Sequence, residues 1–264
     1  MTNNPRVSLL FNSRFYILAV TFLISVVVAA FLRLQIPSDQ LFYIRTQQVY
    51  GLLCIAFWYV ALIISPVGYI IGKKRVSHLE FARRAIGVSA AYFAVLHGSI
   101  ALWGQLGGIS ELALLPSLFQ WSLAGGSFAL LILLIMAATS FDKVVSFMTY
   151  KRWKLLHRLV YIAWILVVLH IWTVGTHMAY TGVQWTVFIA LVILIGLELY
   201  KVSDKLNRKY FKLGRTEAIT LFASTWAICA ALILMTPSVI SNYHTQHNEH
   251  SESKEHNKQK AHDE

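Results

Sequence analysis

The chain has 264 residues, of which 57% are hydrophobic and only 13% are charged, and its mean hydropathy is +0.58. Soluble domains carry roughly 25% charged residues, so this composition excludes an ordinary soluble protein and predicts an all-α, polytopic membrane helix bundle. The net charge of +11 is interpreted as a topology signal and an attraction to membrane lipid headgroups, and not as a nucleic-acid-binding surface.

Apolar runs of about 20 residues are long enough to cross a bilayer, and seven are expected along this chain. They lie near Phe15–Leu34, Val49–Ile71, Arg84–Gly104, Trp121–Ser140, Leu156–Gly175, Val183–Lys201 and Glu217–Ile240. The first run follows basic residues as a signal peptide does, but it lacks a small-residue cleavage site and is interpreted as a retained span. The predicted divisions are an N-terminal segment (1–14), a six-span core (15–215), an extra transmembrane helix (216–240) and a disordered His-rich tail (241–264).

Basic residues gather in alternate connections between these runs. Lysines and arginines cluster after the second, fourth and sixth spans, whereas residues 105–120 and 176–182 contain none. Cytoplasmic loops of membrane proteins carry an excess of Lys and Arg. The pattern therefore predicts an integral membrane protein with a cytoplasmic N-terminus and an extracytoplasmic C-terminal tail.

Three histidines lie in or beside apolar runs: His97, His157 and His170. Ionisable residues inside a membrane are costly and usually functional. At about 1.5 Å per residue, His97 and His170 are expected at the same depth, ~20 Å from the cytoplasmic side. Two imidazoles at one height on neighbouring spans can hold a b-type haem by its two axial positions. The alternative for each histidine is a hydrogen bond to a neighbouring helix.

His157 and the tail leave more than one interpretation open. His157 is expected at the inner membrane interface, beside Arg158, where it is a candidate ligand of a second haem, a contact for a flavin or quinone, or a headgroup-region residue. The tail contains His244, His247 and His250, which are candidate weak ligands for transition metals. A solubilising tail with incidental histidines is the alternative.

Three stretches carry a resemblance to a known family: LIISPVGYI, FARRAIGVSAAYFAVLHG and KRWKLLHRLVYIAWILVVLHI. They resemble the ferric reductase-like transmembrane domain, and within it the stand-alone bacterial branch that includes the haem-binding membrane subunit of the periplasmic methionine sulfoxide reductase system. The resemblance implies a six-span haem b bundle in which His97 and His170 ligate an outer haem and His157 belongs to an inner haem or cofactor site. Two-haem members carry a histidine thirteen residues before the span-three ligand, where this chain has Arg84. A guanidinium there suits a haem propionate or a flavin phosphate.

The function expected from these features is transmembrane electron transfer by one or two b-type haems, as a component of an oxidoreductase. The donor is expected to be a separate cytoplasmic flavoprotein reductase, a quinol, or a bound FMN or FAD. The acceptor is expected to be an extracytoplasmic ferric or cupric ion or a redox protein. Arg33 and Arg45 are the candidate partners of outer haem propionates, and Arg84 and Arg158 are candidate partners of anionic groups at the inner side. A non-redox transporter or a haem-binding sensor subunit that uses the same histidines is the alternative.

Overall fold

The computed structural model describes residues 5–72, 74–175 and 181–211, together with single positions and short stretches between 214 and 231. The described residues form helices, turns and irregular connections, and no strand occurs among them. The α-helices are α1 (Pro5–Gln35), α2 (Asp39–Ile71), α3 (Ser77–Ile100), α4 (Ser117–Ala138), α5 (Asp142–Met148), α6 (Tyr150–Leu156), α7 (Leu159–Val174) and α8 (Thr181–Leu206). A π-helical turn (Ala101–Gln105) and a short 3₁₀ helix (Ser110–Leu114) connect α3 to α4.

Six membrane-length segments within the described part of the chain match the first six predicted spans. They are Arg14–Gln35, Asp39–Ile71, Ser77–Gln105, Ser117–Ala138, Tyr150–Val174 and Thr181–Tyr210. The polytopic helical bundle is thereby confirmed. The predicted seventh span, 217–240, falls largely outside the described residues, and the tail with His244, His247 and His250 falls wholly outside them.

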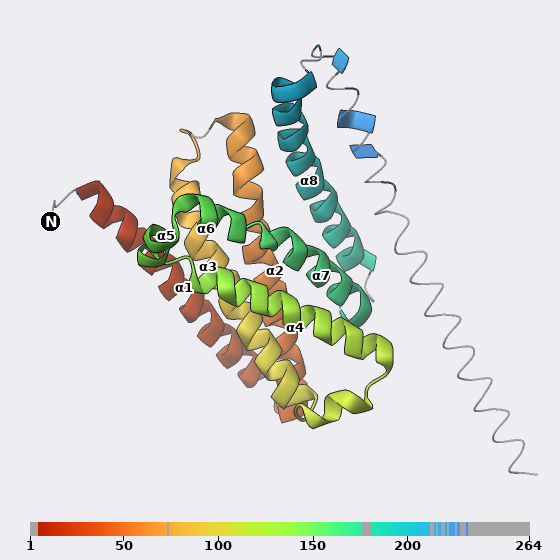
Figure 1. Cartoon of the computed structure of the whole chain (residues 1–264). Coiled ribbons are helices and arrows are strands. Elements are labelled where there is room, and N and C mark those ends of the chain that lie inside the picture. Colours follow the sequence, from red (N-terminus) through yellow and green to blue (C-terminus); the bar gives the residue numbers. More distant parts are fainter. Residues whose placement is uncertain are drawn as a thin grey trace, which may run out of the picture. The chain divides into compact units, whose positions relative to one another are not determined.

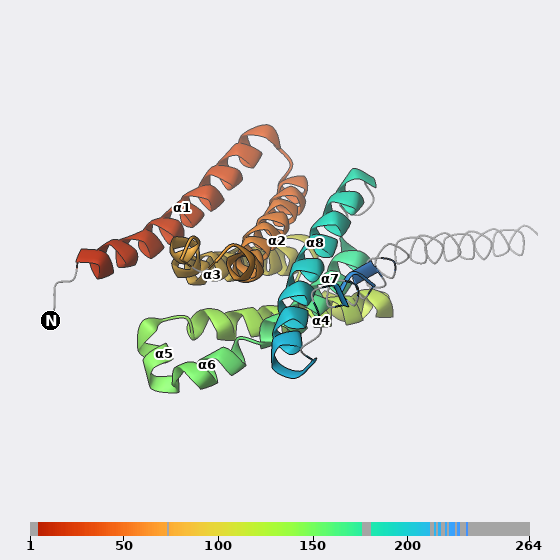
Figure 2. The same cartoon turned by 90° about the horizontal axis from the view of Figure 1, so that it is seen from above.

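Two helical hairpins dominate the first compact unit of the chain, residues 1–184. Helix α2 packs along α3, α4 packs along α7, and α3 also contacts α1 and α4 (Figure 1). Seen from above, α4 to α7 form a layer beside α1, α2 and α3 (Figure 2). His97 of α3 and His170 of α7, which the sequence predicts to meet, therefore come from two different hairpins.

Hydroxyl groups fix α1 against α3. The hydroxyls of Thr21 and Ser89 lie 2.7 Å apart, and those of Ser25 and Tyr92 lie 2.8 Å apart. Polar contacts of this kind join helices in a bilayer, where lipid tails give no hydrophobic drive for association. Beside them, Phe93 is fully buried against Tyr50 of α2. These contacts set the position of α3 and hence of His97.

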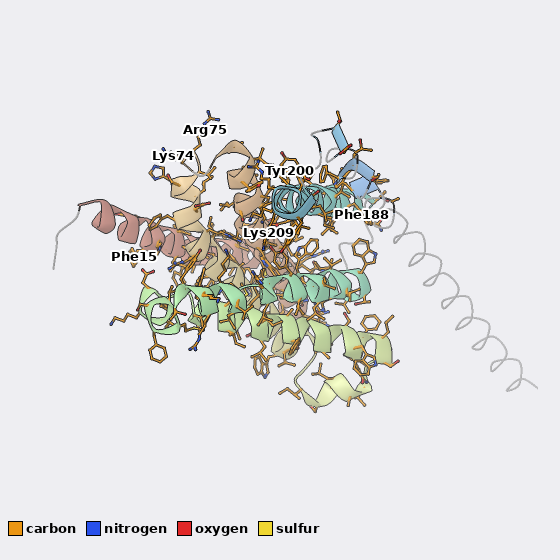
Figure 3. All side chains as sticks on the ribbon, turned by 45° about the horizontal axis from the view of Figure 1, so that its top comes forward. Phe15, Lys74, Arg75, Phe188, Tyr200 and Lys209 are labelled. Carbon is orange, nitrogen blue, oxygen red and sulfur yellow. The ribbon has the colours of Figure 1, made fainter. Side chains whose placement is uncertain are left out.

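The third span begins earlier than the sequence predicts. Helix α3 begins at Ser77 rather than at Arg84, so Arg83 and Arg84 both lie within the helix. The Nε of Arg83 donates a 2.7 Å hydrogen bond to the carbonyl of Ala61, which joins the start of α3 to α2. The basic loop that precedes α3 is short, and Figure 3 shows Lys74 and Arg75 projecting from it.

The fifth span, Tyr150–Val174, matches the predicted run Leu156–Gly175 and contains a turn near the start of that run. Helix α6 ends at Leu156, a turn follows at His157 and Arg158, and α7 begins at Leu159. The indole Nε1 of Trp153 donates a 3.0 Å hydrogen bond to the carbonyl of Thr139, which anchors α6 to the end of the α4 segment. His157 therefore caps α6 rather than lying within the helix of His170.

The second compact unit, residues 185–264, contains most of α8. Helical residues that follow α8 in the chain run back along it: the indole of Trp226 donates to the carbonyl of Val192 at 3.3 Å, and the Phe222 and Tyr200 rings lie 5.5 Å apart. Phe188, Tyr200 and Lys209 of this unit are labelled in Figure 3. These contacts show an antiparallel neighbour for α8 without defining a complete seventh span.

Candidate functional site

His97 of α3 and His170 of α7 face each other across the first unit. Their ring centroids are 6.3 Å apart and their planes are 87° from parallel. The two imidazoles therefore meet at a common height, as their positions along the spans predict. Their role as ligands stays a prediction.

The ring of His97 is held by one turn of α2. Its Nδ1 lies 2.9 Å from the carbonyl oxygen of Gln47. Four residues further along α2, a Cβ added at Gly51 would lie only 3.0 Å from the same nitrogen. A carbonyl accepts only from an N–H, so the proton is assigned to Nδ1 and Nε2 keeps a lone pair that can bind a metal.

His170 is held in the same way by α4. Its Nδ1 lies 3.0 Å from the carbonyl oxygen of Ser122, and a Cβ at Gly126, again four residues on, would lie 2.8 Å from it. One difference separates the two sides: the Ser122 hydroxyl lies 3.4 Å from Nδ1 of His170 and accepts a hydrogen bond from Thr173. Each hairpin thus carries the same clamp, made of a backbone carbonyl, a glycine one turn later and a histidine on the partner helix.

A cluster of aromatic and charged groups lies at the other end of the hairpins. The His157 ring is 4.0 Å from the Trp153 ring, and its Nδ1 is 3.1 Å from the Trp153 carbonyl. The guanidinium of Arg84 lies over the Trp153 ring, 5.0 Å from its centroid. Asp142 accepts from Arg84 at 2.6 Å and from Arg14 at 2.8 Å. We call these residues the inner cluster.

Three of the arginines that the sequence predicts as contacts of anionic groups are exposed: Arg33, Arg45 and Arg158. Arg33 pairs with Asp39 at 2.7 Å and lies over the Phe42 ring, and Arg45 donates to the side chain of Gln48 at 3.1 Å. Arg158 is the N-cap residue of α7. Their assignment to propionates or other anionic groups stays a prediction.

Comparison with known proteins shows which family this chain is similar to. Residues 48–168 match the family described as ferric reductase like transmembrane component. The chain is similar to this family over that segment. The chain is 38% identical over 129 residues to the protein-methionine-sulfoxide reductase heme-binding subunit MsrQ of Deinococcus radiodurans, an alignment that covers 48% of this chain and 60% of the relative. It is 34% identical over 104 residues to the subunit of the same name from Polaromonas naphthalenivorans, covering 39% of this chain and 46% of the relative.

The chain therefore spans about half the length of these relatives, and no solved structure matches it significantly. The ferric reductase-like segment includes His97, His157 and both clamp glycines, and it ends two residues before His170. The clamp carbonyl of Gln47 lies one residue before it. The first clamp thus begins just before the matched segment, and the histidine of the second clamp lies just after it.

Sequence reasoning missed four residues of the two clamps: Gln47, Gly51, Ser122 and Gly126. The glycines of the His97 segment itself face other groups, Gly104 lying against Tyr43 and Gly98 against Leu130. The signal that was present is a glycine inside a long apolar helix. Such a glycine lowers helix stability by about 1 kcal/mol relative to alanine, which indicates that something approaches the backbone closely there.

Proposed function

We propose that this chain is a membrane-bound haem protein that transfers electrons across the bacterial inner membrane, with His97 and His170 as the axial ligands of a b-type haem. The observation that carries the proposal is the 6.3 Å separation of two imidazoles whose Nδ1 atoms are both engaged by backbone carbonyls. The heme-binding subunits to which the chain is similar support the same conclusion.

The spacing of the rings fits two-sided ligation of one metal ion. With metal–nitrogen bonds of about 2 Å and each ring centre about 1.2 Å beyond its nitrogen, the centroids of two axial imidazoles are expected roughly 6.4 Å apart. The separation in this structure is 6.3 Å. Two imidazoles at this distance would hold one haem iron between them.

The chain's own residues would orient the ligands and set their basicity. A carbonyl that accepts from Nδ1–H holds the ring in one tautomer and makes Nε2 a stronger donor to the metal. The clamp glycines let each ring lie against a helix backbone, where a methyl group would displace it. When bound, the haem supplies reversible one-electron chemistry. Ser122 and Thr173 act on His170 alone and give the two ligands different surroundings.

The donor is proposed to be a cytoplasmic flavoprotein, a bound flavin or a quinol, and the acceptor an extracytoplasmic metal ion or redox protein. The relatives' name places them with a methionine sulfoxide reductase, which favours a redox protein as the acceptor. The inner cluster contributes two arginines and one carboxylate, so its net positive charge favours an anionic donor or cofactor. His157 is proposed to contact that donor or an inner cofactor.

An absorption spectrum of the purified protein tests the proposal. The reduced-minus-oxidised spectrum should show the bands of a low-spin, six-coordinate b-type haem. His97→Ala and His170→Ala should each abolish the low-spin signal, because either change leaves one axial position without its imidazole. His78→Ala is the matched control, since His78 is exposed in the first turn of α3, and it should leave the spectrum unchanged.

The same measurement separates the alternatives. A protein without haem bands after expression with excess haem would point to a redox-silent transporter. A bis-imidazole spectrum that survives both alanine substitutions would show that other residues hold the haem. A haem that cannot be reduced by any donor class would indicate a sensor subunit.

A further inference from the structure

Two short helices, α5 and α6, carry an exposed surface that neither the histidine clamps nor the inner cluster uses. They lie between α4 and α7 in the chain, and Figure 2 shows both at one end of the layer that α4 and α7 form. The side of α6 that bears Trp153 is held to the end of the α4 segment by the bond to the Thr139 carbonyl. We call the outward side of the two helices the α5–α6 surface; it carries Lys143, Phe147, Lys151 and Leu155.

Each helix of the α5–α6 surface places a lysine one turn before a large apolar side chain. Lys143 and Phe147 are four residues apart on α5, and Lys151 and Leu155 are four residues apart on α6. Residues at this spacing share one face of a helix. Phe147 is 89% exposed and Leu155 is 64% exposed, and both lysines are exposed. The surface therefore combines cations with apolar groups, as helices at a membrane interface do.

The positive charge of this segment has no partner within the described part of the chain. Residues 141–158 contain one acidic side chain, Asp142, which is shared by Arg14 and Arg84. None of the basic side chains of the segment forms an ion pair or a hydrogen bond with a described residue. They are Lys143, Lys151, Arg152, Lys154 and Arg158. These cations are therefore available to an anionic group from outside the chain.

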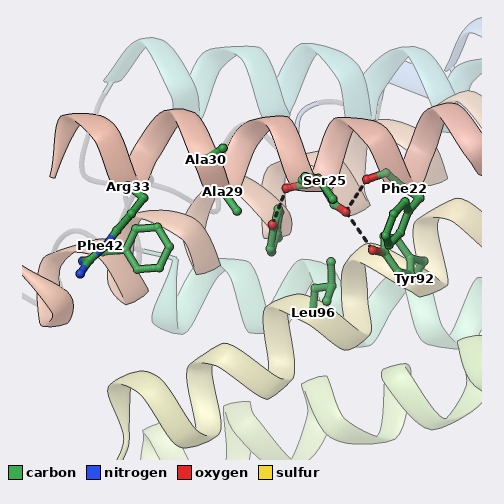
Figure 4. A pocket seen from close by; sticks show the side chains of 10 residues that line it. Phe22, Ser25, Ala29, Ala30, Arg33, Phe42, Tyr92 and Leu96 are labelled. Carbon is green, nitrogen blue, oxygen red and sulfur yellow. Dashed lines mark hydrogen bonds between the residues drawn. The ribbon is translucent and has the colours of Figure 1, made fainter.

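Cations elsewhere in the first unit have different surroundings. Arg33 borders a pocket between α1, α2 and α3, and Figure 4 shows it beside the Phe42 ring. Its guanidinium is paired with the Asp39 carboxylate at 2.7 Å, so it has little attraction left for another anion. Exposed cations also occur in the α2–α3 turn, at Lys74 and Arg75, but the adjacent Val76 is buried. That turn offers charge without an exposed apolar side chain next to it.

Charge alone would suit an acidic protein as well as a lipid headgroup, but the exposed apolar side chains favour lipid. One membrane-length segment ends at Ala138 and the next begins at Tyr150, so the α5–α6 surface lies where the chain leaves and re-enters the bilayer. A soluble partner would leave Phe147 and Leu155 in water whenever it dissociated, whereas acyl chains border this position at all times. Lysine suits such a boundary, because its apolar stem can lie along acyl chains while its ammonium group reaches the phosphates.

We propose that the α5–α6 surface lies in the membrane interface and binds the phosphate groups of anionic phospholipids. Phe147 and Leu155 insert among the acyl chains, and Lys143 and Lys151 contact the headgroups. The inference goes beyond the proposed function, because it does not depend on a haem. Since Trp153 on the other side of α6 contacts Arg84 and His157, bound lipid would steady the helix that carries part of the inner cluster.

Removing two positive charges from the surface tests the proposal. Native mass spectrometry of the full-length protein measures binding of phosphatidylglycerol, with uncharged phosphatidylcholine as the second probe. The double variant Lys143→Gln, Lys151→Gln should bind phosphatidylglycerol about tenfold more weakly and phosphatidylcholine as the wild type does. The matched control, Lys74→Gln with Arg75→Gln, removes the same charge from the α2–α3 turn and should change neither affinity. Equal losses in the two double variants, or no loss in either, would overturn the proposal.

A spin label at Phe147 measures the depth of the surface independently. In the background Cys54→Ser, Cys229→Ser, the full-length protein with Phe147→Cys is labelled and placed in nanodiscs that contain phosphatidylglycerol. Dissolved oxygen, which partitions into acyl chains, should reach this label better than a water-soluble nickel chelate does. The reverse is expected for a label at Lys74→Cys, which is exposed in the α2–α3 turn. Equal access of the nickel chelate to both labels would show Phe147 in water and would overturn the lipid assignment in favour of a soluble partner.

Discussion

At the scale of single residues, the two histidines and the two glycines that touch them have different sequence signals. Counting residues along the spans predicts that His97 and His170 meet, because every α-helical residue rises by the same amount. The clamps cannot be predicted in this way, because the hydrogen-bond acceptors on Gln47 and Ser122 are backbone carbonyls. Every residue has such a carbonyl. Only the two glycines can be recognised in the sequence, and a glycine does not identify the group that lies against it.

Replacing either clamp glycine by alanine should disturb the histidine that lies on it. The added Cβ of Gly51→Ala or Gly126→Ala would lie 3.0 or 2.8 Å from an imidazole nitrogen, and overpacking of this kind costs about 1–3 kcal/mol. We expect a lower haem-to-protein ratio and an altered low-spin band in both variants. Gly87→Ala is the control, since a Cβ there meets no atom within 4 Å. Normal haem content and spectra in both clamp variants would show that the rings have room to move.

At the scale of helices, hydropathy predicts the spans but not their interruptions. The break at His157 has no proline or glycine near it in the stretch KRWKLLHRLVYI. It coincides instead with a tertiary contact, the bond from Trp153 to the Thr139 carbonyl. Local sequence therefore predicts one long helix there, and the residues that hold α6 against the end of the α4 segment lie far from it in the chain. The early start of α3 likewise coincides with a tertiary contact, the bond from Arg83 to the carbonyl of Ala61 in α2.

Asp142 should be important for holding α5 against α1 and α3. Its carboxylate is shared by Arg14 and Arg84, and its side chain is 58% exposed. Because solvent screens exposed pairs, we expect Asp142→Asn to lower the free energy of unfolding by only about 1 kcal/mol. Equilibrium unfolding in detergent measures this, with the exposed Glu111→Gln as the control. A double-mutant cycle with Arg14→Gln should give a coupling energy above zero, and equal stabilities of Asp142→Asn and Glu111→Gln would contradict the assignment.

At the scale of the whole molecule, the number of spans and their orientation depend on different information. Composition and apolar run length predict the polytopic bundle, and the six described spans confirm it. Orientation was predicted from the distribution of Lys and Arg, which reflects how the chain inserts into a membrane.

Cysteine labelling in intact cells tests the orientation. In a background of Cys54→Ser and Cys229→Ser, Ser110→Cys should react with a membrane-impermeant maleimide added outside, because the α3–α4 connection is predicted to be extracytoplasmic. Lys74→Cys, in the basic α2–α3 turn, should react only after the cells are permeabilised. Both positions are exposed. The reverse pattern would invert the predicted topology and the direction of electron flow.

The repeated clamp has a consequence for how the protein matures. Because one imidazole belongs to the α2–α3 hairpin and the other to the α4–α7 hairpin, a ligand that bridges them would hold the two hairpins together. Anything that binds only the assembled form stabilises that form by mass action. Cells short of iron or porphyrin should then accumulate a looser, protease-sensitive form of this protein, so the supply of the prosthetic group would govern its abundance as well as its redox capacity.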